Sequence, residues 1–467
     1  MNLRLAVGST LFGLAWSVLP PSHAAADVTP HGLFQSNMVL QQQMAVPVWG
    51  TAADGEKVSV TLADQTVETI AKDGRWQVTL KPLQAGGPFQ LVIQGNNRVV
   101  LDNVLVGEVW VCSGQSNMQF SMEGVPNAKE AIAQSENPRL RLITLRRQGR
   151  STPQDDVQAD WVECGPKTLG SFSAVGYFFG KALQAKLDVP IGLINGNVGG
   201  TRAEQWTSRE TLQSLPELRH LAENDSSSKL YNGIIHPLMP FAIRGVIWYQ
   251  GESNAGRAYQ YRTLFPAMIA NWRQAWGQGD FPFLFVQLAP FQAIVGEPQE
   301  SELAELREAQ LLTMLKAPHT AMAVITDVGD EKDIHPNQKQ PVGERLALAA
   351  RALAYGENVV YSGPVYKGMT TSGNQAIVSF THANDGLTAK GDKLSGFTMA
   401  GPDKKFHNAQ AEIKDDTVVV VSDQVPRPIA VRYGWADYPL GNLANKNGLL
   451  ASPFRTDDFP GLTAERR

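Results

Sequence analysis

The chain has 467 residues, of which 43% are hydrophobic and 18% are charged. At roughly 100–200 residues per domain this length predicts two to four domains, and the composition excludes collagen-like, coiled-coil and disordered chains. A formal net charge of −4, without a Lys/Arg block, provides no attractive field for nucleic acid. Two cysteines are too few for a disulfide scaffold or a cysteine-rich zinc module.

The first 26 residues have the layout of a secretory signal peptide. Arg4 precedes an apolar run over residues 5–19, and the small residues Ala24–Ala26 follow. The run is shorter than the roughly 20 residues that span a bilayer, which favours a cleaved leader over a membrane anchor. We therefore expect a secreted or periplasmic protein. Export would permit a Cys112–Cys164 disulfide, but a buried free thiol at Cys112 is an equally good prediction.

Residues 27–103 have the pattern of a small all-β module. Val58–Leu62 and Trp76–Leu80 alternate apolar and polar residues, and Asp73-Gly74 supplies a hairpin turn. The alternation predicts an N-terminal β-sandwich.

The residue pattern changes over residues 104–356, where continuous apolar runs alternate with longer amphipathic segments. The predicted strands are Val109–Cys112, Leu140–Leu145, Ile191–Asn195, Gly245–Tyr249, Phe283–Gln287 and Ala321–Thr326. The predicted helices are Ala174–Leu187, Tyr259–Trp276, Glu302–Leu315 and Pro341–Tyr355. This order predicts a three-layer α/β domain with a parallel sheet covered on both faces.

Period-two alternation returns in residues 357–467. It is clearest over residues 375–380, 417–422 and 429–433, with Gly, Asn and Asp between the runs. We therefore expect a C-terminal β-rich module after the α/β domain.

Four loops that follow predicted strands of the α/β domain are rich in glycine and polar residues. They are residues 112–118, 195–202, 248–254 and 326–336. If the sheet is parallel, all four gather at the edge where ligand sites of such sheets lie. The sequence therefore predicts a functional site there.

These loops contain the parts of a serine nucleophile site. Ser116 supplies a hydroxyl, and Gly114 permits the sharp turn before it. His335 can accept the hydroxyl proton, and Asp333 lies within reach of the other imidazole nitrogen. Backbone N–H groups at Gly199 and Gly200, with the amides of Gln250 and Asn254, are candidate donors to an oxyanion. The combination predicts acyl transfer.

Other chemistries have weaker support. His236 is the main rival base, but no carboxylate lies at short spacing from it. The sequence has no His-Glu-x-x-His, paired Cys-x-x-Cys, phosphate-binding or dinucleotide-binding loop. Glu252, Asp330 and Asp333 do not show a spacing that defines a glycosidase pair. We therefore expect no metal and no cofactor.

The sequence resembles the SGNH hydrolase superfamily and, more narrowly, the sialate O-acetylesterase family of carbohydrate esterases. The matching segments are Gly114–Met118, Asn197–Thr201, Trp248–Asn254 and Asp333–Pro336. The resemblance implies a flavodoxin-like SGNH domain and a cofactor-free esterase that removes acetyl groups from sugar hydroxyls. It also implies that Ser116 is the nucleophile, His335 the general base and Asp333 its orienting partner.

The resemblance further implies an oxyanion hole made by the Ser116 N–H, Gly200 and Gln250. The superfamily's third block usually reads Gly-x-Asn-Asp, whereas this chain has Gly251-Glu252-Ser253-Asn254, so Gln250 and Asn254 remain alternatives for the amide donor. The candidate substrate-binding residues are Gln115, Asn117, Arg202, Glu252 and Trp206. Arg202 suits a sialic acid carboxylate, but pairing with Glu204 or Glu252 is an equally good prediction. Trp206, Trp248 and Tyr249 are candidate stacking surfaces. The alternative for Trp248 and Tyr249 is a position in the strand core, which is favoured for Trp248.

The expected substrate is an O-acetylated carbohydrate, with O-acetylated sialic acid as the first candidate. The first alternative is an esterase for acetylated plant polysaccharides such as xylan or xyloglucan. The second is a carbohydrate-binding protein without activity, against which the joint presence of Ser116, Asp333 and His335 argues. Neither a nucleic acid nor a membrane is an expected partner.

Overall fold

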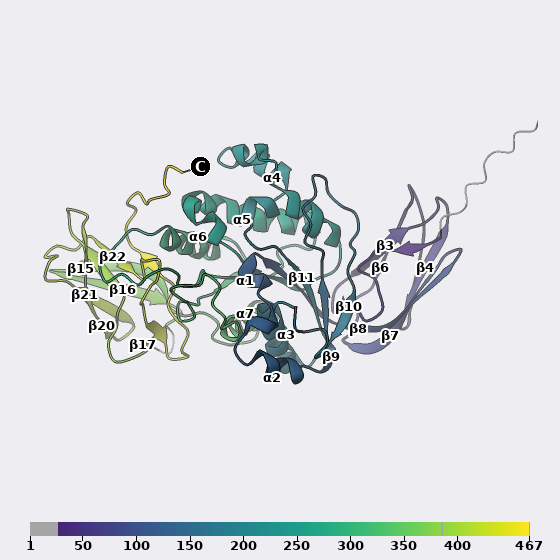
Figure 1. Ribbon diagram of the computed structural model, residues 1–467, viewed down its shortest axis with the longest axis horizontal. Coiled ribbons are helices and arrows are strands. Elements are labelled where there is room, and N and C mark those ends of the chain that lie inside the picture. Colours follow the sequence, from purple (N-terminus) through teal and green to yellow (C-terminus); the bar gives the residue numbers. More distant parts are fainter. Residues whose placement is uncertain (1–26, 384–385, 467) are drawn as a thin grey trace, which may run out of the picture.

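A computed structural model describes residues 27–383 and 386–466. The predicted leader, residues 1–26, lies outside them. A β-rich module at each end of the molecule flanks a central α/β domain (Figure 1). No helix within the described residues is both long enough and apolar enough to span a bilayer.

The N-terminal module consists of a three-stranded sheet, β1-β3-β6, and a second group of strands in which β5, β4 and β7 pair in that order. In β4 and β6 buried apolar residues alternate with polar residues that are exposed or partly exposed, as the sequence pattern predicts. The strands are β1 (Thr29–Pro30), β2 (Val39–Gln41), β3 (Val46–Thr51), β4 (Lys57–Leu62), β5 (Gln65–Ile70), β6 (Arg75–Leu80) and β7 (Gly86–Gln94).

Strand β8 (Arg98–Gly114) is 17 residues long and belongs to both the N-terminal module and the α/β domain. Its first part pairs antiparallel with β7, and its second part pairs parallel with β11 (Ile191–Asn197) and β12 (Gly245–Tyr249). The predicted domain boundary between residues 103 and 104 thus falls inside one continuous strand. Only Gln115 separates the end of β8 from Ser116.

The central sheet has the strand order β10-β9-β11-β8-β12-β13-β14. All neighbours are parallel except the edge strand β10, which runs antiparallel to β9. The strands are β9 (Asn137–Thr144), β10 (Trp161–Cys164), β11 (Ile191–Asn197), β12 (Gly245–Tyr249), β13 (Phe283–Val286) and β14 (Thr320–Ala323). When the parallel strands are numbered in chain order, their order across the sheet is 2-3-1-4-5-6, because β11 lies between β9 and β8.

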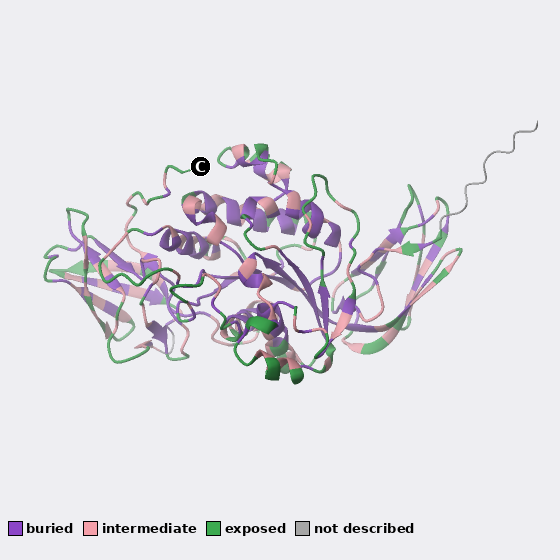
Figure 2. Cartoon of the chain, in the orientation of Figure 1, coloured by how far each residue is buried: buried purple, intermediate pink, exposed green. Residues whose placement is uncertain are grey.

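Two pairs of helices cover the two faces of the sheet, α5 with α6 and α3 with α7 (Figure 1). The strands between them are buried along almost their whole length (Figure 2), as the continuous apolar runs predict. The helices are α1 (Ser116–Gln119), α2 (Ala128–Ala133), α3 (Ala174–Leu187), α4 (Arg209–Ser214), α5 (Ala258–Trp276), α6 (Glu302–Lys316) and α7 (Gln340–Leu353).

Short helical turns occur in the loops between these elements. They are η1 (Met122–Gly124), η2 (Ala203–Trp206), η3 (Arg219–Glu223), η4 (Tyr231–Ile235), η5 (His236–Leu238) and η6 (Glu252–Arg257). Two of them, η2 and η6, lie in the glycine-rich loops after β11 and β12.

The C-terminal module contains sheets with the orders β15-β16-β21-β20, β17-β23 and β19-β18-β22-β24. The strands are β15 (Val365–Ser372), β16 (Gln375–Thr381), β17 (Leu387–Ala389), β18 (Phe397–Ala400), β19 (Phe406–Asn408), β20 (Gln410–Lys414), β21 (Thr417–Val421), β22 (Ala430–Tyr433), β23 (Leu443–Asn445) and β24 (Phe454–Arg455).

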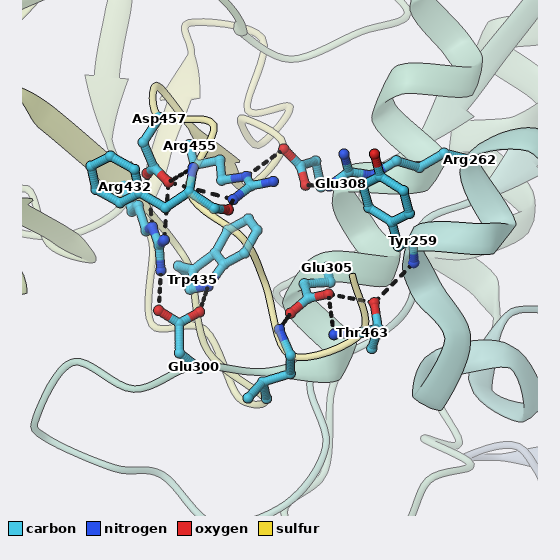
Figure 3. A network of polar contacts seen from close by, with 12 residues as sticks. Tyr259, Arg262, Glu300, Glu305, Glu308, Arg432, Trp435, Arg455, Asp457 and Thr463 are labelled. Atoms are coloured by element: carbon cyan, nitrogen blue, oxygen red, sulfur yellow. Dashed lines mark hydrogen bonds and ion pairs between the residues drawn. The ribbon is translucent and has the colours of Figure 1, made fainter. Parts of the chain in front are cut away.

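A network of buried charges attaches this module to the α/β domain (Figure 3). Asp457, whose side chain is 1% exposed, binds Arg432 at 2.9 Å and Arg455 at 3.4 Å. Arg455 also binds Glu308 of α6 at 2.8 Å, and Glu308 contacts Arg262 of α5. The network therefore runs from the β-strands of the module to both helices on one face of the central sheet.

The two cysteines are free thiols, and both are buried. Cys112 lies in β8 and Cys164 ends β10. Burial raises the pKa of the Cys164 thiol to about 12 and raises that of Cys112 further. Of the two alternatives left open by the sequence, the structure has the buried free thiols.

Candidate active site

The four glycine-rich loops gather at the carboxyl edge of the sheet, as their positions after parallel strands predict. The first follows β8, which lies between β11 and β12, so the chain crosses from one side of β8 to the other at this point. Such a crossover opens a crevice at the ends of the neighbouring strands. Ser116 lies at this crossover.

The sequence-predicted nucleophile and base are in contact. Ser116 Oγ lies 2.8 Å from His335 Nε2. Asp333 Oδ1 lies 3.3 Å from His335 Nδ1 and also accepts the His335 backbone N–H at 2.8 Å. The side chains of His335 and Asp333 are 37% and 61% exposed. The three side chains are thus in contact in the order Ser-His-Asp, and those of His335 and Asp333 are partly exposed to solvent.

The turn before Ser116 depends on the close approach of two backbones. Gly114 has a φ of 138°, and a Cβ there would lie 2.2 Å from the carbonyl oxygen of Tyr249. The next residue, Gln115, donates its N–H to that same oxygen at 2.9 Å. Only glycine allows this approach, and the turn places Ser116 at the first position of α1.

Two backbone N–H groups near the Ser116 hydroxyl are available to a bound group. Within residues 27–383 and 386–466, the N–H groups of Ser116 and Gly200 have no protein acceptor. Gly200 has a φ of 69°, and a Cβ there would meet no atom within 4 Å, so the space beside it is open. The Gly199 N–H, in contrast, donates to Gln119 Oε1 at 2.8 Å.

The amides of Gln250 and Asn254 are buried, at 0% and 1% exposure. Gln250 Nε2 donates to the Thr201 carbonyl at 3.1 Å and to Asn254 Oδ1 at 2.7 Å. Asn254 also accepts the Ala203 N–H at 2.9 Å and donates to Glu204 at 3.0 Å. Both amide protons of Gln250 are therefore used inside the protein, and the pair braces the loop after β11. This placement does not support Gln250 as the oxyanion donor.

Of the five residues predicted to bind substrate, the structure exposes only Arg202. Trp206 is 0% exposed, donates its indole N–H to Thr201 Oγ1 at 3.0 Å and packs edge-on against Trp248. Trp248 and Tyr249 are also 0% exposed. These positions correct the expectation that Trp206 and Tyr249 stack on a sugar, and they confirm the core position favoured for Trp248, because η2 and β12 turn the three rings into the core.

The other three residues lie around Ser116: two of them are buried and Glu252 is half-buried. Gln115 and Asn117 are 3% and 1% exposed. Asn117 Nδ2 donates to Glu252 Oε1 at 2.6 Å, and the remaining carboxylate oxygen of Glu252 is buried. The rival base His236 binds the Gln154 carbonyl through Nδ1 at 2.9 Å, which is a structural role.

One residue of this region was missed by the sequence reasoning. Lys339, just before α7, is 1% exposed and donates its ammonium group to Asn117 Oδ1. No pattern in the sequence marked it, because a single lysine in a polar loop is normally solvated.

Comparisons with known proteins identify the family of this chain. Residues 106–352 match the model of the family described as carbohydrate esterase, sialic acid-specific acetylesterase. The sialate O-acetylesterase of Mus musculus is 31% identical, over 86% of this chain and 88% of that protein. The human sialate O-acetylesterase is 30% identical, over 91% of this chain and 92% of that protein.

The solved structure of a carbohydrate acetylesterase from Xanthomonas citri is 41% identical. It superposes on this chain with a TM-score of 0.88, and the match covers 93% of this chain and 100% of the Xanthomonas citri chain. On these matches the chain belongs to the sialic acid-specific acetylesterase family of carbohydrate esterases, and it is a carboxylic ester hydrolase for acetylated carbohydrates.

Proposed function

We propose that the protein is a serine esterase of the SGNH type that removes O-acetyl groups from carbohydrates through Ser116, His335 and Asp333. The observation that carries the proposal is the 2.8 Å contact between Ser116 Oγ and His335 Nε2. A hydroxyl at this distance from an imidazole can transfer its proton as it attacks a carbonyl carbon. The test is release of acetate from an acetylated sugar by the purified protein.

The reaction follows from the positions of these groups. Ser116 Oγ attacks the acetyl carbon while His335 Nε2 takes its proton, and the carbonyl oxygen becomes an oxyanion. The N–H groups of Ser116 and Gly200 donate to that oxyanion. His335 then protonates the departing sugar oxygen, which leaves an acetyl group on Ser116. A water, deprotonated by the same imidazole, releases acetate and restores the serine.

Asp333 supports the base without accepting the proton. We expect Asp333→Asn to lower kcat for acetate release less than His335→Ala does, because the asparagine still accepts the His335 backbone N–H through its carbonyl oxygen. The aspartate side chain is 61% exposed, so water screens its charge. Steady-state kinetics on a chromogenic acetate ester measure the order of the two effects. An unchanged kcat in Asp333→Asn would assign the orienting role to another group.

For the sugar, we propose O-acetylated sialic acid as the substrate, recognised at its carboxylate by Arg202. Arg202 is exposed and lies two residues after Gly200. Within the described residues its guanidinium pairs with no carboxylate, and a guanidinium binds a carboxylate through two parallel hydrogen bonds. The relatives named sialate O-acetylesterase support this choice.

We expect Arg202→Gln to raise KM for O-acetylated sialic acid by roughly tenfold, the effect of losing about 1.4 kcal/mol of binding, with little change in kcat. Hydrolysis of a neutral acetate ester should be unchanged, because it has no carboxylate. The matched control is Arg98→Gln, which removes an exposed arginine at the far end of β8. An equal effect of Arg202→Gln on charged and neutral substrates would contradict the assignment.

The exposure of the site favours acetylated plant polysaccharide as the second candidate. With His335 and Asp333 partly in solvent, a polymer can reach Ser116 as readily as a terminal sugar can. Acetate release from O-acetylated sialic acid, acetylated xylan and acetylated xyloglucan, compared at equal acetyl content, separates the candidates. A higher kcat/KM on either polysaccharide would replace sialic acid as the proposed substrate.

A further inference from the structure

Two opposite charges, Lys339 and Glu252, contact Asn117 beside the proposed nucleophile and have no part in the reaction steps above. Lys339 is 1% exposed, and the carboxylate of Glu252 has a buried oxygen with no hydrogen-bond partner among the described residues. Burial of either charge alone is costly, so such groups persist only where other groups compensate for them. Their location next to Ser116 and His335 suggests that they serve the reaction.

Asn117 connects the two charges to both catalytic loops. Its carbonyl oxygen accepts from the Lys339 ammonium group, and its Nδ2 donates to Glu252 Oε1 at 2.6 Å and to the Ile334 carbonyl at 3.0 Å. Asn117 directly follows Ser116, and Ile334 directly precedes His335. One side-chain amide thus spans the loop of the nucleophile and the loop of the base.

The two charges fix which way this amide points. An ammonium group only donates and a carboxylate only accepts, so Lys339 holds the amide oxygen on its side, and Glu252 holds the amide nitrogen on the other. The reversed orientation would direct N–H groups at the ammonium and remove the donor to Ile334. The link between the catalytic loops therefore depends on both charges.

Burial and the groups around Lys339 act in opposite directions on its charged form. Its Nζ lies 4.8 Å from the ring centroid of Phe120 and 5.4 Å from that of Tyr249, within the range of cation–π attraction. Burial lowers the pKa of Lys339 to about 7, against the opposing effect of the Glu252 and Asp333 carboxylates. Burial raises the pKa of Glu252, against its hydrogen bond from Asn117 and the charges of Lys339 and His335.

Asp333 also contacts His335, but this contact holds the imidazole more weakly. The contact from Asp333 to the imidazole is 3.3 Å long, and the Asp333 side chain is 61% exposed. Hydrogen bonds of that length in water constrain a side chain little. The bond from Asn117 to Ile334, in contrast, is shielded from solvent on the Asn117 side.

From this geometry we propose that Lys339 and Glu252 are positioning residues, which act through Asn117 to hold Ser116 and His335 at reacting distance. The inference depends on the proposed serine mechanism, in which that distance controls proton transfer. Neither residue touches the substrate in this account.

The test compares Lys339→Met with Glu252→Gln. Each variant should lower kcat by about 10–100-fold with KM changed less than threefold, since a misplaced nucleophile loses rate rather than affinity. The double variant should lose no more than the worse single variant, because the two charges act through one amide. Losses that multiply would contradict action through Asn117.

The pH profile provides a readout that general damage would not produce. Removing the positive charge favours protonation of the neighbouring base, so the acid limb of kcat/KM should move to higher pH in Lys339→Met. Removing the negative charge should move it to lower pH in Glu252→Gln. The ionisable groups that face the pair are His335, Asp333, Tyr249, Tyr261 and Arg307. Acid limbs that stay in place in the two variants, or that move in the same direction in both, would overturn the proposal.

The matched control is Glu108→Gln, in the same strand β8 as the turn before Ser116. Glu108 is 0% exposed and pairs with Arg244 at 2.7 Å, and it lies six positions along the strand, about 20 Å, before Gly114. This variant should lower the melting temperature and leave kcat within threefold of wild type. If Lys339→Met does not fold, Glu252→Gln tests the same proposal with almost no change of shape.

Labelling with a fluorophosphonate separates this inference from the proposed function. The probe forms a bond between phosphorus and Ser116 Oγ, fluoride leaves, and the serine proton passes to His335. If the wild type is not labelled at Ser116, the serine mechanism fails. If it is labelled and both variants react at the wild-type rate, the positioning role fails while the mechanism stands.

Discussion

Ser116→Ala should lower kcat for acetate release by a factor on the order of 10⁴ or more. The alanine has no hydroxyl to attack the acetyl carbon, and His335 then has no proton to accept at 2.8 Å. What activity remains would come from the oxyanion donors at residues 116 and 200 acting on attack by water. The measurement is acetate release from an acetylated sugar at saturating substrate.

The fold should survive this change, because Ser116 is partly exposed at the first position of α1 and alanine is a good helix former. A circular dichroism spectrum and a melting temperature equal to those of the wild type are the structural controls. Ser113→Ala is the matched serine control: its hydroxyl is buried in β8 and has no hydrogen-bond partner among the described residues. It should keep kcat within about threefold, and wild-type kcat in Ser116→Ala would refute the nucleophile.

Asp457→Asn should lower the free energy of unfolding by about 3 kcal/mol, the cost of breaking a buried ion pair. Asp457 lies between Arg432 and Arg455, and these side chains are 3% and 5% exposed. Without the Asp457 carboxylate, the buried guanidinium groups of Arg432 and Arg455 have less negative charge beside them. They also lose a contact with the C-terminal end of the chain (Figure 3). Denaturant unfolding followed by tryptophan fluorescence measures the change.

The neighbouring Asp458 provides the control for this prediction. Asp458 is exposed, so Asp458→Asn should change the free energy of unfolding by less than about 0.5 kcal/mol. Because the network joins the C-terminal module to α5 and α6, Asp457→Asn should also allow that module to separate before the α/β domain unfolds. Equal stability of the two variants would mean that Asp457 contributes nothing beyond a surface charge.

Much of the architecture was predictable from the sequence because its signals are local. The predicted helix Ala174–Leu187 and the predicted strand Gly245–Tyr249 match α3 and β12 residue for residue. The gathering of the four loops followed from parallel strands alone. The contact between Ser116 and His335 could also be anticipated, because both lie in loops that follow strands of that one sheet.

The features that could not be predicted depend on contacts distant in sequence. Trp206 follows a glycine-rich loop, as a substrate-binding tryptophan would, and only the short turn η2 directs it against Trp248. The sequence does not show that the Gln250 amide is hydrogen-bonded to Thr201 and Asn254. The sequence likewise does not show that Lys339 is buried, because it is a single lysine in a loop.

The shared strand β8 has a consequence for protein engineering. An expression clone starting near residue 104, as a boundary drawn from composition suggests, would remove the first six residues of β8 and the whole of its antiparallel partner β7. The shortened product would keep Ser116 and His335. It would also expose the apolar start of the remaining strand, which would have lost its antiparallel partner. Such a fragment should aggregate, so the smallest useful esterase from this chain retains the N-terminal module.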